Sequence, residues 1–259
     1  MHDAAIKPIR LGVKAGEAVG TTAFFRNRSL FDTLLFEFAN SPKSHFNILF
    51  HASSIGPEAY SFIIRYLSLG HDKKYTIACY ATDKESGFLQ FARNATYTNT
   101  ILKGMTSTEK EYFEPSGDAV TVKCQVRKFI TFLPASDFRD FETTERFEVV
   151  FLLNAFIYVN LQEQADTIDK ISVYNTDWFL TTGFHNESIK DDMVRNGYEP
   201  NTTNIEEIYS SWTDRLKSKP RDKEDLPENT FTDWTIQPFS KIEDYEYKNC
   251  AIFQSTKPK

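Results

Sequence analysis

The chain has 259 residues and a formal net charge of −6, and its aromatic share of 15% includes 23 Phe. Such a composition favours a folded protein with a sizeable core over a disordered chain. Lys and Arg are scattered along the sequence, so no nucleic-acid surface is indicated. Three widely spaced cysteines, Cys79, Cys124 and Cys250, fit neither a zinc site nor a disulfide framework.

Targeting and membrane signals are absent from the sequence pattern. The first twenty residues have no apolar core of signal-peptide length, and no later segment is apolar for long enough to span a bilayer. We therefore expect a cytoplasmic protein without membrane insertion. Residues 1–20 are interpreted as an N-terminal arm before one domain over 21–259, and the sequence gives no basis for an oligomeric state.

A helix is predicted directly after this arm, with Thr21 or Thr22 as its cap. Its apolar stripe comprises Leu30, Leu34, Leu35 and Phe38. The pair Phe24 and Phe25, followed by Arg26, is unusual at a helix start. In the simplest interpretation the two rings plug the edge of a sheet and Arg26 is a solvated surface charge.

The run over residues 46–64 joins a short apolar strand to an amphipathic helix through a turn of small residues. Ala52 and Gly56 allow close backbone approach, and Pro57 suits a first helical position. Such a turn places free backbone N–H groups at the carboxyl edge of an open α/β sheet, the usual place for a nucleotide-like ligand. Glu58 in the first helical turn favours a cationic ligand over a phosphate. The same pattern also occurs in α/β connections that bind nothing.

A second buried strand is predicted over residues 75–82, and it ends at Asp83. An acidic residue at the end of this strand is a recurrent ribose ligand, because a carboxylate can accept from two vicinal hydroxyl groups. Asp83 could instead cap the helix predicted over residues 86–94. The two roles are compatible.

The remaining elements are expected in a looser pattern. Residues 97–126 indicate a small β insertion, because a PSGD turn separates short alternating segments. The rest of the core is expected to consist of strands over 128–133, 147–151 and 178–182 and a helix over 161–173. Residues 214–228 are charged and predict a solvated loop or lid. Residues 230–236 and 250–256 are expected to form an antiparallel pair at the sheet edge.

Five blocks then connect these elements to a known family. They are TAFFR, HASSIGPEAYS, ATDKESGFLQFARNATY, FEVVFLLNAFIYV and GFHNES. In this order they resemble motifs of the CheR family, the S-adenosylmethionine-dependent methyltransferases that esterify glutamate side chains of chemotaxis receptors. The resemblance covers roughly residues 21–187. It implies an α/β, class I (Rossmann-like) methyltransferase fold with a mostly parallel sheet, an antiparallel C-terminal edge and a small β insertion.

The resemblance also implies a cofactor, S-adenosylmethionine, with S-adenosylhomocysteine as its product. The residues that would bind it are Thr22, Ala52, Gly56, Glu58, Asp83 and Asn154. Thr22 and Glu58 would contact the methionine part, with Glu58 pairing with the ammonium group. Asp83 would bind the ribose hydroxyl groups, and Asn154 would line the cofactor pocket.

Arg26 and Tyr158 are the catalytic residues that the resemblance implies, facing the sulfonium methyl and the acceptor. A carboxylate acceptor is ionised at neutral pH, so its methylation needs no general base. The site then mainly holds the reacting atoms in line, with Arg26 gripping the carboxylate through a fork of N–H groups while Tyr158 orients it. No metal is required, and the sequence offers no credible set of metal ligands.

The sequence departs from the family pattern at several positions. Pro57 and Ala59 alter the cofactor loop, Leu153 replaces an arginine, and Phe132 stands where an asparagine is expected near the adenine. Only about twenty residues precede the first block, so the family's N-terminal helical domain is not expected. The partner that this domain would recognise, a chemotaxis receptor, is therefore not implied by the sequence.

Three hypotheses follow. The first is an O-methyltransferase acting on a protein carboxylate, and it is favoured by the joint retention of Arg26, Glu58, Asp83 and Tyr158. The second is a methyltransferase of a small-molecule carboxylate, with residues 214–228 as a lid. The third is a catalytically silent cofactor-binding or scaffold domain, motivated by Leu153 and Phe132.

Overall fold

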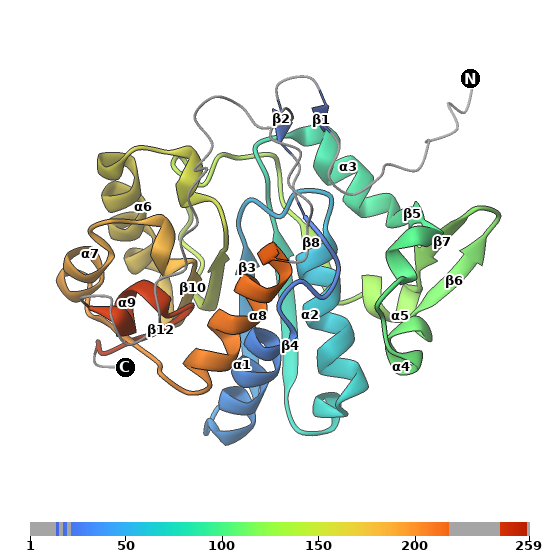
Figure 1. Cartoon of the computed structure of the whole chain (residues 1–259), viewed down its shortest axis with the longest axis horizontal. Coiled ribbons are helices and arrows are strands. Elements are labelled where there is room, and N and C mark those ends of the chain that lie inside the picture. Colours follow the sequence, from blue (N-terminus) through green and yellow to red (C-terminus); the bar gives the residue numbers. More distant parts are fainter. Residues whose placement is uncertain (1–13, 16–17, 20–21, 218–243, 258–259) are drawn as a thin grey trace.

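A seven-stranded sheet forms the centre of the protein in the computed structural model, which describes residues 14–15, 18–19, 22–217 and 244–257 (Figure 1). Its strands are ordered β11-β12-β10-β9-β3-β4-β8. Their bounds are β3 (His45–Phe50), β4 (Thr76–Ala81), β8 (Ile130–Phe132), β9 (Phe147–Leu152), β10 (Asn175–Thr181), β11 (Tyr198–Pro200) and β12 (Ile252–Ser255). Helices cover both faces of this sheet.

The strands from β8 to β10 run parallel, whereas β12 is antiparallel to both β10 and β11. Phe46, Ile48, Leu49 and Phe50 of β3 are fully buried, because helices cover both faces of this central strand. The sheet confirms the expected fold class with its antiparallel C-terminal edge. Chain order reverses between β3 and β9, and ligands of open α/β sheets bind at the carboxyl edge of such a switch point.

The helices predicted after the arm, after the small-residue turn, over residues 86–94 and over residues 161–173 are present, and the structure shows further helices that were not predicted. They are α1 (Arg28–Asn40), α2 (Pro57–Ser68), α3 (Ser86–Asn94), α4 (Ser107–Lys110), α5 (Cys124–Arg127), α6 (Leu161–Tyr174), α7 (Ile189–Arg195), α8 (Ile205–Lys217) and α9 (Tyr245–Asn249). Short 3-10 turns occur at η1 (His71–Lys73), η2 (Asn99–Leu102), η3 (Phe156–Tyr158) and η4 (Gly183–His185).

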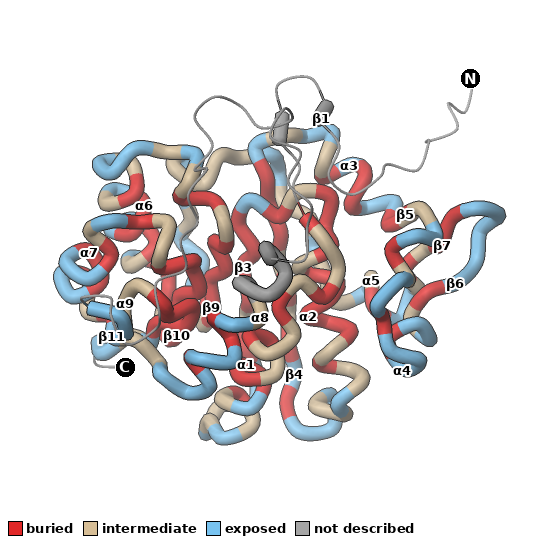
Figure 2. Tube along the Cα trace, in the orientation of Figure 1, coloured by how far each residue is buried: buried red, intermediate tan, exposed pale blue. Residues whose placement is uncertain are grey.

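Two apolar cores lie on the two faces of the sheet, and buried residues follow its strands in Figure 2. On the face of α1 and α2, Phe38 stacks on Phe46 with ring centroids 4.1 Å apart. On the other face, Ile168 and Ile171 of α6 pack with Phe179 of β10. These cores fix the strand ends, and thereby the edge at which the predicted site residues lie.

A second, three-stranded sheet lies at one end of the molecule. Its strands are β5 (Thr96–Thr98), β7 (Ala119–Val122) and β6 (Phe113–Ser116), all paired antiparallel. This sheet confirms the expected small β insertion. Two short paired strands, β1 (Lys14–Ala15) and β2 (Ala18–Val19), lie in the segment that was interpreted as an arm.

Three sequence expectations need correction. Helix α1 begins at Arg28 rather than after Thr22, because Asn27 is the N-cap and its Oδ1 accepts from the Leu30 amide at 3.0 Å. Residues 214–217 belong to α8 rather than to a loop. The antiparallel neighbours of β12 are β10 and β11, while residues 230–236 and 218–228 lie outside the described residues.

Among the helices that the structure describes, none combines the length and the apolar character needed to cross a bilayer.

Candidate functional site

The loop after β3 folds tightly against the carboxyl edge of the sheet. Ala52, Ser54 and Gly56 alternate in the left-handed region, with φ of 48°, 51° and 94°. A Cβ at Gly56 would lie 3.0 Å from Tyr60 Cε2 and 3.1 Å from Ala92 Cβ. Glycine is therefore required at this position both by its backbone conformation and by the close approach of α3.

Two buried tyrosines hold this loop in place through hydrogen bonds to backbone carbonyl groups. The Tyr60 hydroxyl donates to the Ala92 carbonyl at 2.7 Å, which joins α2 to α3. The Tyr97 hydroxyl donates to the Ile55 carbonyl at 2.5 Å, which joins the β insertion to the loop itself. The backbone of the loop is thus held in place by neighbouring elements, which suits a preformed binding site.

Asp83 follows β4 and is buried with only 7% of its surface exposed. Its Oδ2 accepts from the Ser54 amide at 2.8 Å, and its Oδ1 accepts from the Glu85 amide at 2.9 Å. Burial raises the pKa of this carboxyl, although the two amide hydrogen bonds oppose the shift. Each oxygen keeps a second acceptor direction, so the carboxylate can still receive ribose hydroxyl groups. The N-cap of α3 is Glu85, and Asp83 therefore supports the helix start without capping it.

Unpaired buried polar atoms gather around the same strand ends. Ser53 Oγ, Ser54 Oγ and Asn154 Nδ2 have no hydrogen-bond partner among the described residues. Asn154 follows β9 in a left-handed conformation, with φ of 57°, and its amide donates to Thr182 Oγ1 at 3.1 Å. Such groups call for a polar partner, and a bound nucleoside would supply one. Together with the Gly56 cradle and Asp83, they fit the cofactor that the sequence implies.

Glu58 and Arg26 form an ion pair at this edge. Arg26 Nη2 lies 3.4 Å from Glu58 Oε2, and the side chains are 18% and 12% exposed. Burial raises the pKa of Glu58 to about 6, although the neighbouring Arg26 charge opposes this shift. The sequence assigned the two side chains to different ligands and gave no sign of their contact, which joins residues 32 positions apart.

Arg26 is presented by a short left-handed turn rather than by a helix. Phe25 has φ of 50°, and its amide donates to Ser61 Oγ at 2.8 Å. Ser61 Oγ in turn donates to the Pro57 carbonyl at 2.6 Å. The turn is therefore fastened to the first turns of α2, where Glu58 lies. Phe25 is buried, which agrees with the interpretation that its ring plugs the sheet, but Arg26 is not a solvated surface charge.

Tyr158 lies in η3, beyond the carboxyl end of β9, and 59% of it is exposed. Its turn is tied to η4 by Gln164 Nε2, which donates to the Phe156 carbonyl at 2.7 Å and to the His185 carbonyl at 3.3 Å. Burial, and secondarily the charge of Arg26, lowers the pKa of His185 to about 3. Electrostatics thus connects η4 with Arg26, while Gln164 connects η4 with the turn of Tyr158.

His185, whose pKa is lowered by burial and by the charge of Arg26, was given no role in the sequence prediction, although the block GFHNES contains it. Thr22, which the sequence placed at the cofactor, is buried at 8% exposure four residues before Arg26. Among the described residues no group of three or more His, Cys, Asp or Glu could hold a metal ion.

The two departures from the family pattern are accommodated differently. Phe132, at the end of β8, is half-buried, and the Arg93 guanidinium lies 5.7 Å from its ring centroid. Arg93 also donates to the Phe132 carbonyl at 3.1 Å. Leu153 is 7% exposed and joins the apolar core, so a side chain without charge suits its position.

An open, mostly parallel sheet with a glycine-containing loop and an acid at adjoining strand ends defines a Rossmann-like domain of the kind that binds a nucleotide-like cofactor. A family model described as "CheR methyltransferase, SAM binding domain" matches residues 20–201, more than half of the chain. The chain belongs to this family and is an S-adenosylmethionine-dependent methyltransferase domain. The family match and the fit of the site residues agree on S-adenosylmethionine as the cofactor.

Solved structures with a similar fold are distant. Magnesium protoporphyrin IX methyltransferase (ChlM) from Synechocystis PCC 6803 is 12% identical, with 67% of this chain and 70% of that chain covered and a TM-score of 0.42. The glycopeptide N-methyltransferase MtfA is 17% identical, with 65% and 58% covered and a TM-score of 0.37. The N-methyltransferase NodS from Bradyrhizobium japonicum WM9 is 15% identical, with 60% of each chain covered and a TM-score of 0.35. A search of curated proteins found no match.

Proposed function

We propose that the protein transfers the methyl group of S-adenosylmethionine to a carboxylate, and that the acceptor is a glutamate side chain of a protein. The observation that carries the proposal is the ion pair between Arg26 and Glu58. A guanidinium that already pairs with a carboxylate at this edge can also hold the carboxylate of an acceptor, and its fork of N–H groups suits a bidentate contact. The ammonium group of the cofactor would replace Arg26 as the ion-pair partner of Glu58, and Arg26 would then bind the carboxylate of the acceptor.

The bases available near Arg26 also favour a carboxylate acceptor. Bound S-adenosylmethionine supplies an electrophilic methyl group on a sulfonium. An amine or hydroxyl acceptor must lose a proton, whereas a carboxylate is already ionised. His185, which feels the charge of Arg26, has a pKa of about 3 and is therefore a weak base. A carboxylate lone pair can form the O–CH₃ bond as the S–CH₃ bond breaks, with no proton transferred.

The remaining side chains would act by position. Asp83 and the backbone of the loop after β3 would bind the nucleoside, and Thr22, Ala52, Gly56 and Asn154 would complete its surroundings. Tyr158 would orient the acceptor through its hydroxyl group, which stands on an exposed ring at the edge of the sheet. Holding the acceptor oxygen, the methyl carbon and the sulfur in line can lower the barrier by several kcal/mol.

Base-labile methylation tests this proposal. The protein is incubated with tritiated S-adenosylmethionine and an extract of its source organism, and the products are separated into protein and small-molecule fractions. We expect label on protein that base releases as methanol, as an ester requires. Label confined to small molecules would reject the protein acceptor, and label resistant to base would reject the carboxylate.

Arg26→Ala gives the matched test of the acceptor grip. We expect this variant to bind S-adenosylhomocysteine in calorimetry at about pH 8 or above, where Glu58 stays mostly ionised even without the Arg26 charge, but to transfer methyl groups at least about tenfold more slowly. Arg195→Ala, which removes a half-exposed arginine on α7, is the control and should behave as the wild type. An unchanged rate of methyl transfer by Arg26→Ala would show that Arg26 does not hold the acceptor. If the wild type does not bind S-adenosylhomocysteine, the catalytically silent domain is the remaining hypothesis.

A further inference from the structure

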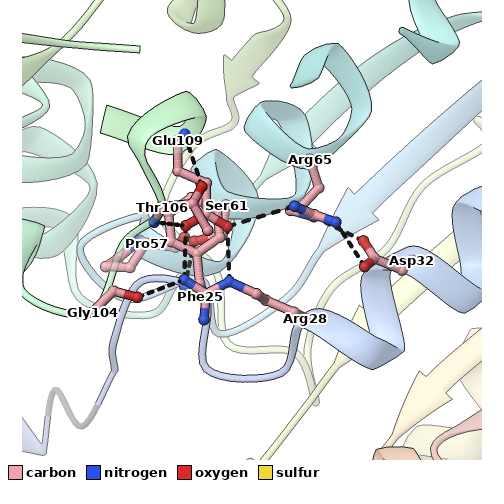
Figure 3. Close-up of polar contacts among 9 residues, drawn as sticks. All are labelled: Phe25, Arg28, Asp32, Pro57, Ser61, Arg65, Gly104, Thr106 and Glu109. Carbon is pink, nitrogen blue, oxygen red and sulfur yellow. Dashed lines mark hydrogen bonds and ion pairs between the residues drawn. The ribbon is translucent and has the colours of Figure 1, made fainter. Parts of the chain in front are cut away.

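A buried carboxylate connects the β insertion with the helix that follows Arg26 (Figure 3). Glu109 of α4 is fully buried, and its oxygens accept from Arg28 Nε and Nη2, both at 2.7 Å. Its Oε2 also accepts from the Thr106 amide at 2.9 Å. Burial opposes ionisation, but the hydrogen bonds from Arg28 and from this amide outweigh it and lower the pKa of Glu109.

Arg28 stands at the start of α1, two residues after Arg26. Its guanidinium lies 4.9 Å from the Phe25 ring centroid, and its Nη2 also donates to the Gly104 carbonyl at 3.0 Å. One side chain therefore touches both the left-handed residue of the turn and two segments of the insertion. Arg26 is therefore preceded by the buried Phe25 and followed, two residues later, by Arg28, which is held by Glu109 and Gly104.

A second ion pair belongs to the same network but holds a different part of it. Arg65 of α2 donates to both oxygens of Asp32, at 2.8 and 2.7 Å, and lies 3.6 Å from Glu109 Oε1. Asp32 is 40% exposed and sits one helical turn beyond Arg28. This outer pair joins α1 to α2, and Figure 3 connects it to Glu109 rather than to Phe25.

The energetics of buried ion pairs favour a positioning role for the Arg28–Glu109 pair, which we call the inner pair. Burying a carboxylate and a guanidinium costs desolvation energy that their attraction roughly offsets, so apolar pairs often replace them without loss of stability. What a bidentate pair supplies is one fixed geometry. The left-handed conformation of Phe25 is disfavoured for a bulky residue and persists only where its surroundings impose it.

We propose that Glu109 and Arg28 are positioning residues for methyl transfer, which hold the turn at Phe25 so that Arg26 stands beside Glu58. The proposal rests on the proposed grip of Arg26 on the acceptor. It makes the β insertion a part of the active site, since α4 supplies the carboxylate that sets the place of a residue 83 positions earlier in the chain. Glu109 and Arg28 would act through Arg26, without a contact of their own to the cofactor or the acceptor.

The test reads the position of Arg26 without requiring an acceptor. The titration of the Glu58 carboxyl is followed by ¹³C NMR, because the charge of Arg26 holds the pKa of Glu58 below the value that burial alone would give. Arg26→Gln gives the reference, with a midpoint about one pH unit higher. We expect Glu109→Gln to raise the midpoint by a comparable amount, with the affinity for S-adenosylhomocysteine at a pH above 7 changed less than about threefold.

Asp32→Asn is the matched control, because it breaks the outer pair on the same helix and should leave the Glu58 midpoint unchanged. If the Glu58 midpoint in Glu109→Gln equals that of the wild type, the proposal is overturned. It is also overturned if Asp32→Asn shifts the Glu58 midpoint as much as Glu109→Gln does, because the shift would then reflect a general loss of packing rather than the position of Arg26. If Glu109→Gln does not fold, the double variant Arg28→Met with Glu109→Leu replaces it, and the Glu58 midpoint is measured in the same way. If neither variant folds, the Arg28–Glu109 pair serves stability alone and the proposal is rejected. None of these outcomes depends on whether methyl transfer occurs.

Discussion

Cofactor binding should weaken as the pH falls through about 6, because Glu58 then loses the charge that we propose pairs with the cofactor ammonium. Burial raises the pKa of this carboxyl from 4.5 to about 6 in the free protein. The amino and carboxyl groups of the cofactor keep their charges between about pH 5 and pH 7, so Glu58 is the group that changes. His185, with a pKa of about 3, stays neutral over the same window.

The size of the effect follows from the midpoint. If only the ionised form of Glu58 binds, the dissociation constant rises roughly tenfold for each pH unit below the midpoint, which corresponds to about 1.4 kcal/mol. An ordinary glutamate would give this loss near pH 4.5 instead. Protonation of Glu58 removes a buried charge, so its contribution to folding stability rises as the pH falls from about 6 toward 4.5. The expected change is therefore one of affinity and not of unfolding.

Calorimetric titration with S-adenosylhomocysteine at several pH values measures this dependence. Glu58→Gln should bind about 10- to 100-fold more weakly above pH 7, because a charge-assisted hydrogen bond is lost, and its affinity should hardly vary with pH. A profile in Glu58→Gln that matches the wild type would refute the assignment of the ammonium to Glu58. A wild-type midpoint near 4.5 would refute the role of burial.

Three other substitutions test the site and the fold. Asp83→Ala should raise the dissociation constant of S-adenosylhomocysteine by about tenfold or more, because it removes both the proposed acceptor for the ribose hydroxyl groups and the partner of the Ser54 amide. An unchanged dissociation constant in calorimetry would exclude Asp83 from the site. Gly56→Ala should destabilise the protein by about 1 to 3 kcal/mol in urea unfolding, since its Cβ would lie 3.0 Å from Tyr60 and its φ is 94°, and an unchanged midpoint would contradict this. Lys43→Met should cost about 1 to 2 kcal/mol, because Lys43 Nζ lies 2.7 Å from the buried Asp177 carboxylate, and equal thermal stability of variant and wild type would show that the pair contributes nothing.

Local patterns in the sequence were sufficient where one element carries its own signal. The apolar run of β3, the proline at the start of α2 and the helix Ser86–Asn94 were all predicted at or within a residue of their observed bounds. Strand and helix periodicities report on burial of the residue's own segment, so they are readable without knowledge of the neighbours. The order of five short blocks then identified the family, and the family model confirms it.

Boundaries with competing signals were less predictable. Thr22 and Asn27 both offer a side chain that can cap a helix, and only the left-handed Phe25 between them decides in favour of Asn27. Strand β11 is three residues long, too short for an alternating pattern to be recognised. It forms because β12 offers it a free edge, and that edge exists only after the sheet has assembled.

The sequence by itself therefore determined the fold class, the cofactor and the residue types at the strand ends, because these depend on short contiguous stretches. Tertiary structure alone decided that Arg26 meets Glu58, and that Glu109 of the insertion is buried against Arg28. Each of these contacts joins residues more than thirty positions apart. Their distances depend on how α1, α2 and α4 pack together, and no local periodicity encodes that packing.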